Sequence, residues 1–173
     1  MRKSSATART VGALAAVVLA AGCGGSDGSP DPTDPTDPVV DEDWTASLTN
    51  GAVVGANPQT GASGSATLEW NGTRLSWTIN VNNMTNVIQA HIHGPATREQ
   101  NAPVRMWLFR PDQPTGTVNG QLVSGSATSA TADMEGGATL AQVLSWMRSD
   151  EAHVMVHTTT FPDGEIRGHL VED

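Results

Sequence analysis

The sequence predicts an all-β domain, an immunoglobulin-like or Greek-key β-sandwich with one short helix. From Trp44 onward the chain consists of short runs in which apolar and polar residues alternate, separated by Gly, Asn, Pro and Asp. Alternation of this kind places one face of each strand against a core and the other toward solvent. About seven such runs, with turns at regular intervals, are typical of a two-sheet sandwich.

The strands are expected in a regular series along the domain. The clearest pair is 66–70 and 74–81, because the Asn71-Gly72 dipeptide between them is a strong hairpin signal. Further strands are expected at 87–93, 104–109, 121–128, 153–158 and 165–171.

One helix is expected, over about residues 139–149. Within the stretch TLAQVLSWMRSD the apolar side chains recur at helical spacing, and they are Leu140, Val143, Leu144 and Met147. A helix with one apolar face needs a surface to cover, and here that surface should be the sheet.

The first residues carry the pattern of an export signal. Residues 1–10 are basic and hold no acidic residue, and residues 11–21 are apolar throughout. This order is typical of a signal peptide, and the apolar part is too short to span a bilayer as a helix. We therefore expect residues 1–22 to be removed and the protein to be exported.

The expected cleavage point is followed by the single cysteine of the chain, Cys23. The stretch LAAGC (19–23) resembles the bacterial lipobox, in which the Cys is lipidated and becomes the first residue after cleavage. Acyl chains on this residue, palmitate among them, would anchor the protein to a membrane of the cell envelope, with its domain outside the cytoplasm. The alternative is an ordinary cleavage site at which the Cys has no such role.

Residues 23–43 form the expected connection between the anchor and a domain at 44–173. The tract repeats Asp-Pro-Thr and is rich in Gly and Ser near its start. Each proline biases the residue before it away from helix, and repelling carboxylates extend the chain. Such a composition builds no core and predicts a disordered tether.

The mature chain is strongly acidic. From Cys23 onward it holds six Arg, no Lys and all 18 acidic residues, which gives a formal charge of −12. Such a surface repels phosphate backbones, which argues against nucleic acid as a partner. The domain has no Cys for a disulfide or for thiol chemistry, so apolar burial must hold the fold.

Two segments resemble one known family. The first is QAHIHGPA (89–96), followed by PVRMWLF (103–109), and the second is EAHVMVHTTTFPDGEIRGHL (151–170). Together they resemble the CHRD domain, first recognised in chordin and common in bacterial secreted proteins, over about residues 44–171. The resemblance implies a β-rich, immunoglobulin-like domain outside the cytoplasm, without a settled biochemical activity. The matching positions are His91, His93, Gly94, Pro95, His157, Gly164, Glu165, Arg167 and Gly168.

All five histidines fall on the faces opposite the aliphatic residues of their strands, because successive side chains of a strand alternate between faces. The residues on these faces include His91, His93, His153, Met155, His157 and His169. His153 and His169 stand where CHRD domains more often show other residues, so the resemblance supports a role for them less.

This grouping predicts a candidate metal site. A His-x-His pair such as His91 and His93 presents two imidazoles on one face, as zinc and copper sites need, and His157 would complete the set. His153 and Met155 are further candidate ligands, and the thioether would favour copper. The alternative is that these histidines only hydrogen-bond to backbone and carboxylate groups.

Two charged residues of the last strand belong to the same hypothesis. Glu165 and Arg167 are two positions apart, can share a face, and are expected to form an ion pair. If a metal binds, one of them would orient a ring nitrogen of a ligand. A role in binding an acidic ligand is the other interpretation.

Three classes of function remain. The one we expect is a cell-envelope binding or adhesion module, and the alternative is a protein that binds copper or zinc. The third is a metalloenzyme, because the HIH segment resembles the His-x-His strand of copper-zinc superoxide dismutases. The sequence has no nucleophile elbow, phosphate-binding glycine loop or His-Glu-x-x-His helix, which favours a non-catalytic role. The sequence identifies neither the binding partner nor the oligomeric state.

Overall fold

The computed structural model describes residues 41–56 and 58–173. The expected signal peptide, the expected lipidation site Cys23 and nearly all of the expected tether lie outside the described residues. Within the described part, no helix combines the length and the apolar character that crossing a membrane requires.

The described residues fold around one antiparallel nine-stranded sheet with the order β5-β4-β7-β8-β1-β2-β3-β6, and β9 pairs with β1. In chain order the first five strands are β1 (Glu42–Thr49), β2 (Ser63–Trp70), β3 (Arg74–Thr85), β4 (Val87–His93) and β5 (Val104–Phe109). They are followed by β6 (Thr117–Thr128), β7 (His153–Thr158), β8 (Ile166–His169) and β9 (Val171–Glu172). A 3-10 turn, η1 (Asn50–Ala52), and a helix, α1 (Leu140–Arg148), complete the elements.

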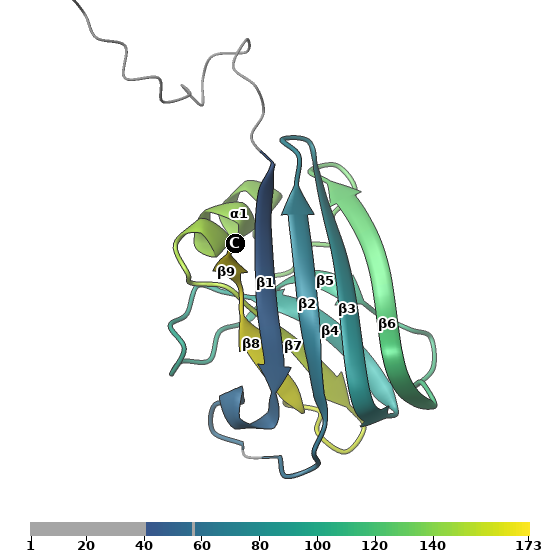
Figure 1. Ribbon diagram of the computed structural model, residues 1–173. Helices are drawn as coiled ribbons and strands as arrows, with labels where there is room; N and C mark the ends of the chain where they lie inside the picture. Colours follow the sequence, from purple (N-terminus) through teal and green to yellow (C-terminus); the bar gives the residue numbers. More distant parts are fainter. Residues whose placement is uncertain (1–40, 57) are drawn as a thin grey trace, which may run out of the picture. The chain divides into compact units, whose positions relative to one another are not determined.

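The sheet curls so that its two ends approach each other. β1, β2, β3 and β6 form one layer, and β4, β5, β7 and β8 lie behind it (Figure 1). Near the ends of the path, the indole N–H of Trp77 in β3 donates to the carbonyl oxygen of Leu108 in β5 at 3.2 Å. The prediction of an all-β domain with one short helix is confirmed.

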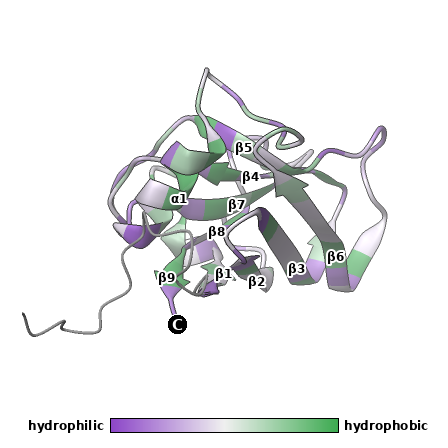
Figure 2. Ribbon diagram, turned by 90° about the horizontal axis from the view of Figure 1, so that it is seen from above, coloured by the Kyte–Doolittle hydropathy of each residue, from purple (hydrophilic) through white to green (hydrophobic). Residues whose placement is uncertain are grey.

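The hydrophobic core fills the space between the two layers. Its fully buried side chains include Trp44 and Leu68 from one layer and Ile92 and Val154 from the other. Figure 2 shows stretches of hydrophobic residues in green along β4 and β7. Burial of apolar surface stabilises a folded domain by about 25 cal/mol per Å² of surface buried. This core therefore stabilises the domain, which has no disulfide.

The helix lies close to where the sequence placed it. Its buried residues are the four predicted ones, Leu140, Val143, Leu144 and Met147. It begins after a capping box, in which the Thr139 hydroxyl accepts from the Gln142 N–H at 3.3 Å and the Gln142 side chain accepts from the Thr139 N–H at 2.9 Å.

Most expected strands agree with the structure, and the differences have physical causes. The bounds of β4, β5 and β7 are those predicted. Strands β3 and β6 extend further, to Thr85 and from Thr117, because mostly exposed polar residues continue their pairing beyond the apolar alternation. The expected strand at 165–171 is divided between β8 and β9.

Strand β1 was not among the expected strands. It begins at Glu42, ahead of the expected domain start at Trp44, and pairs with β2 along its whole length. The Glu42 carboxylate forms a bidentate ion pair with Arg148 of α1, with both contacts at 2.6 Å. The ordered domain therefore includes the last acidic residues of the predicted tether.

Candidate metal centre

The predicted histidine face lies on three neighbouring strands, β4, β7 and β8. In register across these strands, one row contains His93, His153 and His169. The next row contains His91, Met155 and Arg167, and in the third Gln89 pairs with His157. The aliphatic neighbours Ile92, Val154 and Ile166 belong to the hydrophobic core, so these side chains occupy the opposite face of the layer.

This polar face is nonetheless buried. The exposed fraction of the histidines ranges from 0% for His153 to 8% for His169, and that of Arg167 is 0%. The covering segments are η1 and the residues that follow η1, β4 and β7, and their backbone carbonyl groups accept hydrogen bonds from the polar side chains. These acceptors are Ala52, Thr97, Arg98, Gln100, Ala102 and Pro162.

Three of the histidines converge as the sequence predicted. His91, His93 and His157, the trio, each offer one ring nitrogen, and these nitrogens all lie within 4.8 Å of one another. Nδ1 of His91 is 3.2 Å from Nε2 of His157. Two nitrogen ligands of a tetrahedral ion, each about 2.0–2.1 Å from the metal, lie about 3.3 Å apart. This pair therefore already has the separation of two metal ligands.

Backbone carbonyl groups fix the tautomers of two trio members. Nδ1 of His93 lies 2.8 Å from the carbonyl oxygen of Ala102, and Nδ1 of His157 lies 2.9 Å from that of Pro162. A carbonyl oxygen only accepts, so each Nδ1 carries the hydrogen and each Nε2 keeps its lone pair. Such an outer hydrogen bond is the usual way in which proteins orient a metal-binding imidazole.

The trio is also held in the uncharged form that binds metals. Burial lowers the pKa of His91 from 6.5 to about 3, and the neighbouring His157 contributes further. Burial likewise lowers the pKa of His93 to about 4, against the opposing effect of its hydrogen bond to Ala102. The pKa of His157 is also lowered, mainly by burial. At neutral pH the three imidazoles are therefore neutral, as metal binding requires. The lone pair of His157 Nε2 accepts a hydrogen bond from His91 Nδ1, which a bound ion would have to replace.

A cavity of about 530 Å³ adjoins the trio. Beside the three imidazoles, its lining includes Gln89, Asn101, Met155 and Asp163. The segment after η1 contributes Val54, Gly55 and Ala56 to its wall. A metal ion or a small ligand could reach the trio through this space.

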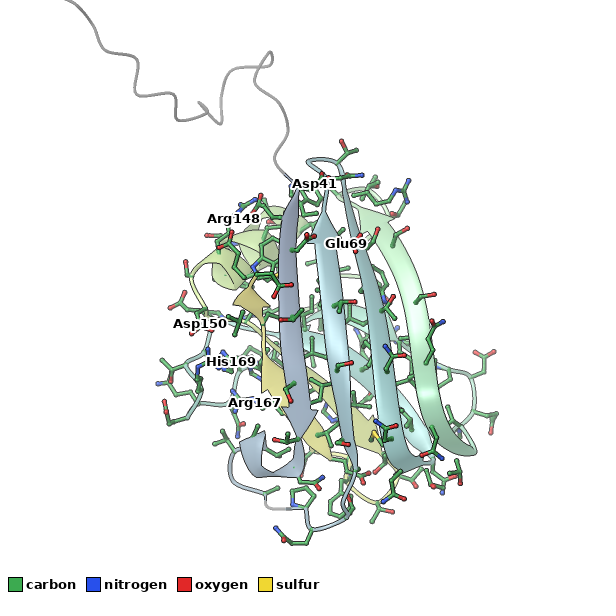
Figure 3. All side chains as sticks on the ribbon, viewed as in Figure 1. Asp41, Glu69, Arg148, Asp150, Arg167 and His169 are labelled. Atoms are coloured by element: carbon green, nitrogen blue, oxygen red, sulfur yellow. The ribbon has the colours of Figure 1, made fainter. Side chains whose placement is uncertain are left out.

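His153 and His169 have a different partner, the guanidinium of Arg167. Its Nη2 lies 3.3 Å from Nδ1 of His153 and 3.1 Å from Nε2 of His169. Arg167 and His169, which Figure 3 labels, both lie on β8. Because a guanidinium only donates, these two nitrogens accept, and the hydrogen of each ring is on its other nitrogen. The His153 ring also stacks on His93 at 5.1 Å and 8°. In this arrangement neither His153 nor His169 offers a free lone pair to a metal.

The CHRD domain family matches residues 44–170, which is most of the chain. The chain belongs to the CHRD domain family. The resemblance seen in the sequence is thereby confirmed, and membership supports an extracellular or envelope module without naming an activity. No curated protein matches the chain. No solved structure matches it.

The expected ion pair between Glu165 and Arg167 is wrong. In this CHRD domain the Glu165 carboxylate accepts from the hydroxyls of Thr60 and Thr158, both at 2.7 Å. Arg167 instead donates to loop carbonyl groups and to the two imidazoles described above. Among the described residues neither charged side chain hydrogen-bonds a member of the trio. The two-residue spacing predicted that both side chains share a face, but each has other partners, which lie in the covering loops and in β7 and β8.

Residue types provide no direct signal for the groups that orient the trio. The carbonyl oxygens of Ala102 and Pro162 belong to the backbone, whose partners residue types do not specify. The one usable signal was the turn at 162–164, which the proline and glycine predict. The backbone of this turn lies against the Met155 side chain at Gly164. Gly164 has φ +115°, and a Cβ at this position would collide with the Met155 sulfur, so the close approach requires glycine.

Proposed function

We propose that this chain is an exported, lipid-anchored envelope protein whose CHRD domain holds a copper or zinc ion between His91, His93 and His157. The supporting observation is the convergence of three neutral imidazoles, two of them oriented by backbone carbonyl groups. The anchor at Cys23 rests on the basic, apolar and small residues that precede it in the sequence.

The hydrogen bonds favour a metal site over a purely structural cluster. Nε2 of His93 keeps its lone pair, is buried and has no hydrogen-bond partner among the described residues. A buried polar group without a partner costs about 1–3 kcal/mol, so a structural cluster would be expected to satisfy it. A bound ion would take up the lone pair of His93 and would replace the hydrogen bond between His91 and His157.

Metal titration tests the proposal. The protein, purified without a polyhistidine tag, is freed of metal and titrated with Zn²⁺ and with Cu²⁺ in a calorimeter at pH 7.5. We expect one equivalent to bind, and His93→Ala to weaken binding by at least about tenfold, which corresponds to 1.4 kcal/mol. His169→Gln is the matched control, because His169 lies on the same face but bonds to Arg167.

The outcomes separate the two classes of function. If the wild-type protein binds neither ion, or if His93→Ala binds as tightly as wild type, the trio is structural. The domain would then be the metal-free envelope-binding module that the sequence first suggested. Binding that is lost in both His93→Ala and His169→Gln would place the ion elsewhere on the histidine face.

A further inference from the structure

Met155 is a buried methionine that lies outside the hydrophobic core. Its exposed fraction is 4%, yet it is absent from the core cluster that contains Met84, Met106 and Met147. It lies instead on the polar face, in register with His91 on one side and Arg167 on the other. Apolar packing in the core therefore does not explain this side chain.

Met155 is a neighbour of the trio in the sheet and in the cavity wall. Met155 lines the same cavity as His91, His93 and His157. The turn at 162–164 lies against the sulfur at Gly164, where a Cβ would collide with it. The same turn supplies the Pro162 carbonyl that fixes the tautomer of His157. One turn thus holds both a trio imidazole and the thioether.

The ligands and the nearest buried charge favour a monovalent ion, although the Asp163 carboxylate, which lines the same cavity, acts in the opposite direction on His157. The three imidazoles and the thioether are neutral ligands, so they do not offset the charge of an ion. The guanidinium of Arg167 is fully buried, lies opposite Met155 in register, and donates to carbonyl groups and imidazoles rather than to a carboxylate. Coulomb repulsion grows with the product of the charges, so this cation opposes a dication about twice as strongly as a monocation.

We propose that Met155 supplies a thioether ligand to the ion held by the trio, and that the site selects copper as Cu(I) over zinc. The inference rests on the proposed function, because it requires that the trio bind a metal. Thioethers are soft ligands that favour Cu(I), whereas zinc sites in proteins use Cys, His and carboxylate groups. The neutral ligands and the buried guanidinium of Arg167 also favour the monovalent Cu(I) over Zn²⁺.

Competition experiments test the selectivity. Cu(I) affinity is measured without oxygen against the chelator bicinchoninate, and Zn²⁺ affinity is measured against a zinc-binding dye. Met155→Leu preserves side-chain volume, and we expect it to weaken Cu(I) binding by at least about tenfold while changing Zn²⁺ binding less than about twofold. Met147→Leu is the control, because Met147 is buried in the core away from the histidine face.

Each result supports or overturns the inference. Equal losses of Cu(I) and Zn²⁺ affinity would make Met155 a packing residue, and wild-type protein that binds zinc more tightly than Cu(I) would contradict the selectivity. Both outcomes leave the metal site intact, whereas a wild-type protein that binds no metal would remove the proposed function itself. If Met155→Leu does not fold, X-ray absorption spectroscopy of the wild-type copper complex identifies the ligand atoms of the copper. The inference requires a sulfur ligand, and it fails if only nitrogen ligands are seen.

Discussion

Acid should unfold the metal-free domain because its buried histidines are neutral. Burial is the main cause that lowers the pKa of His91 to about 3, of His93 to about 4 and of His153 to about 2. For His153 the buried charge of Arg167 is the next contribution. At pH 5 these three rings stay neutral in the folded domain but are protonated in the unfolded chain, where a His titrates near 6.5.

The sign and size of the effect follow from proton linkage. The unfolded chain binds more protons, so the free energy of unfolding falls as the pH falls from 6.5 toward the pKa values of the folded state. Between pH 7.5 and pH 5 each of the three histidines removes about 2 kcal/mol of stability. Together they remove about 6 kcal/mol, which is comparable with the total stability of about 5–15 kcal/mol of an ordinary domain.

Urea unfolding monitored by tryptophan fluorescence measures this loss. Trp44 is fully buried in the core and reports on the fold. The metal-free protein, kept in a chelator, should show a steep fall in unfolding free energy between pH 7.5 and pH 5. His153→Gln should make that fall shallower by about 2 kcal/mol, because one of the titrating groups is gone. A stability that stays level across this range would refute the burial of neutral imidazoles.

Further changes test the anchor, the turn and the domain boundary. Cys23→Ala should release the protein into soluble fractions or leave an uncleaved precursor, and a variant that is processed and fractionates like wild type would refute lipidation. Gly164→Ala should lower the unfolding free energy by about 1–3 kcal/mol, because it combines a positive φ with a collision at Met155. Gly116→Ala, with nothing within 4 Å of the added methyl group, is its control and should melt like wild type. A chain that starts at Asp41 should melt at the temperature of the mature protein, whereas a start at Trp44 removes the Glu42–Arg148 ion pair and should cost up to about 1 kcal/mol. A large drop for the Asp41 start would show that earlier residues contribute to the fold.

The strands that the sequence predicted best have strong alternation between clear turns. β4, β5 and β7 carry Val, Ile, Leu or Met at most of the positions that face the core, and turn signals bound them. β1 also alternates, with Trp44, Ala46 and Leu48 buried, but its apolar pattern is weakened by the small Ala46 and by the adjoining acidic tract. Local composition therefore concealed a strand whose stability comes from pairing with β2.

The candidate site was predictable as a face but not as a set of contacts. Alternation placed His91, His93 and His157 together, because strand geometry alone decides which side chains share a face. It could not separate them from His153, whose ring nitrogen is occupied by Arg167. That division depends on loops folded over the strands and on backbone carbonyl groups, which no residue pattern specifies.

The most direct test of the metal site is to locate the ion. Crystals of the protein grown with copper or with zinc, measured at the absorption edge of the metal, would show the ion by its anomalous scattering. We predict one site, with ring nitrogens of His91, His93 and His157 about 2.0–2.2 Å from the metal. No ordered ion in the protein, or an ion bound away from these three imidazoles, would contradict the account.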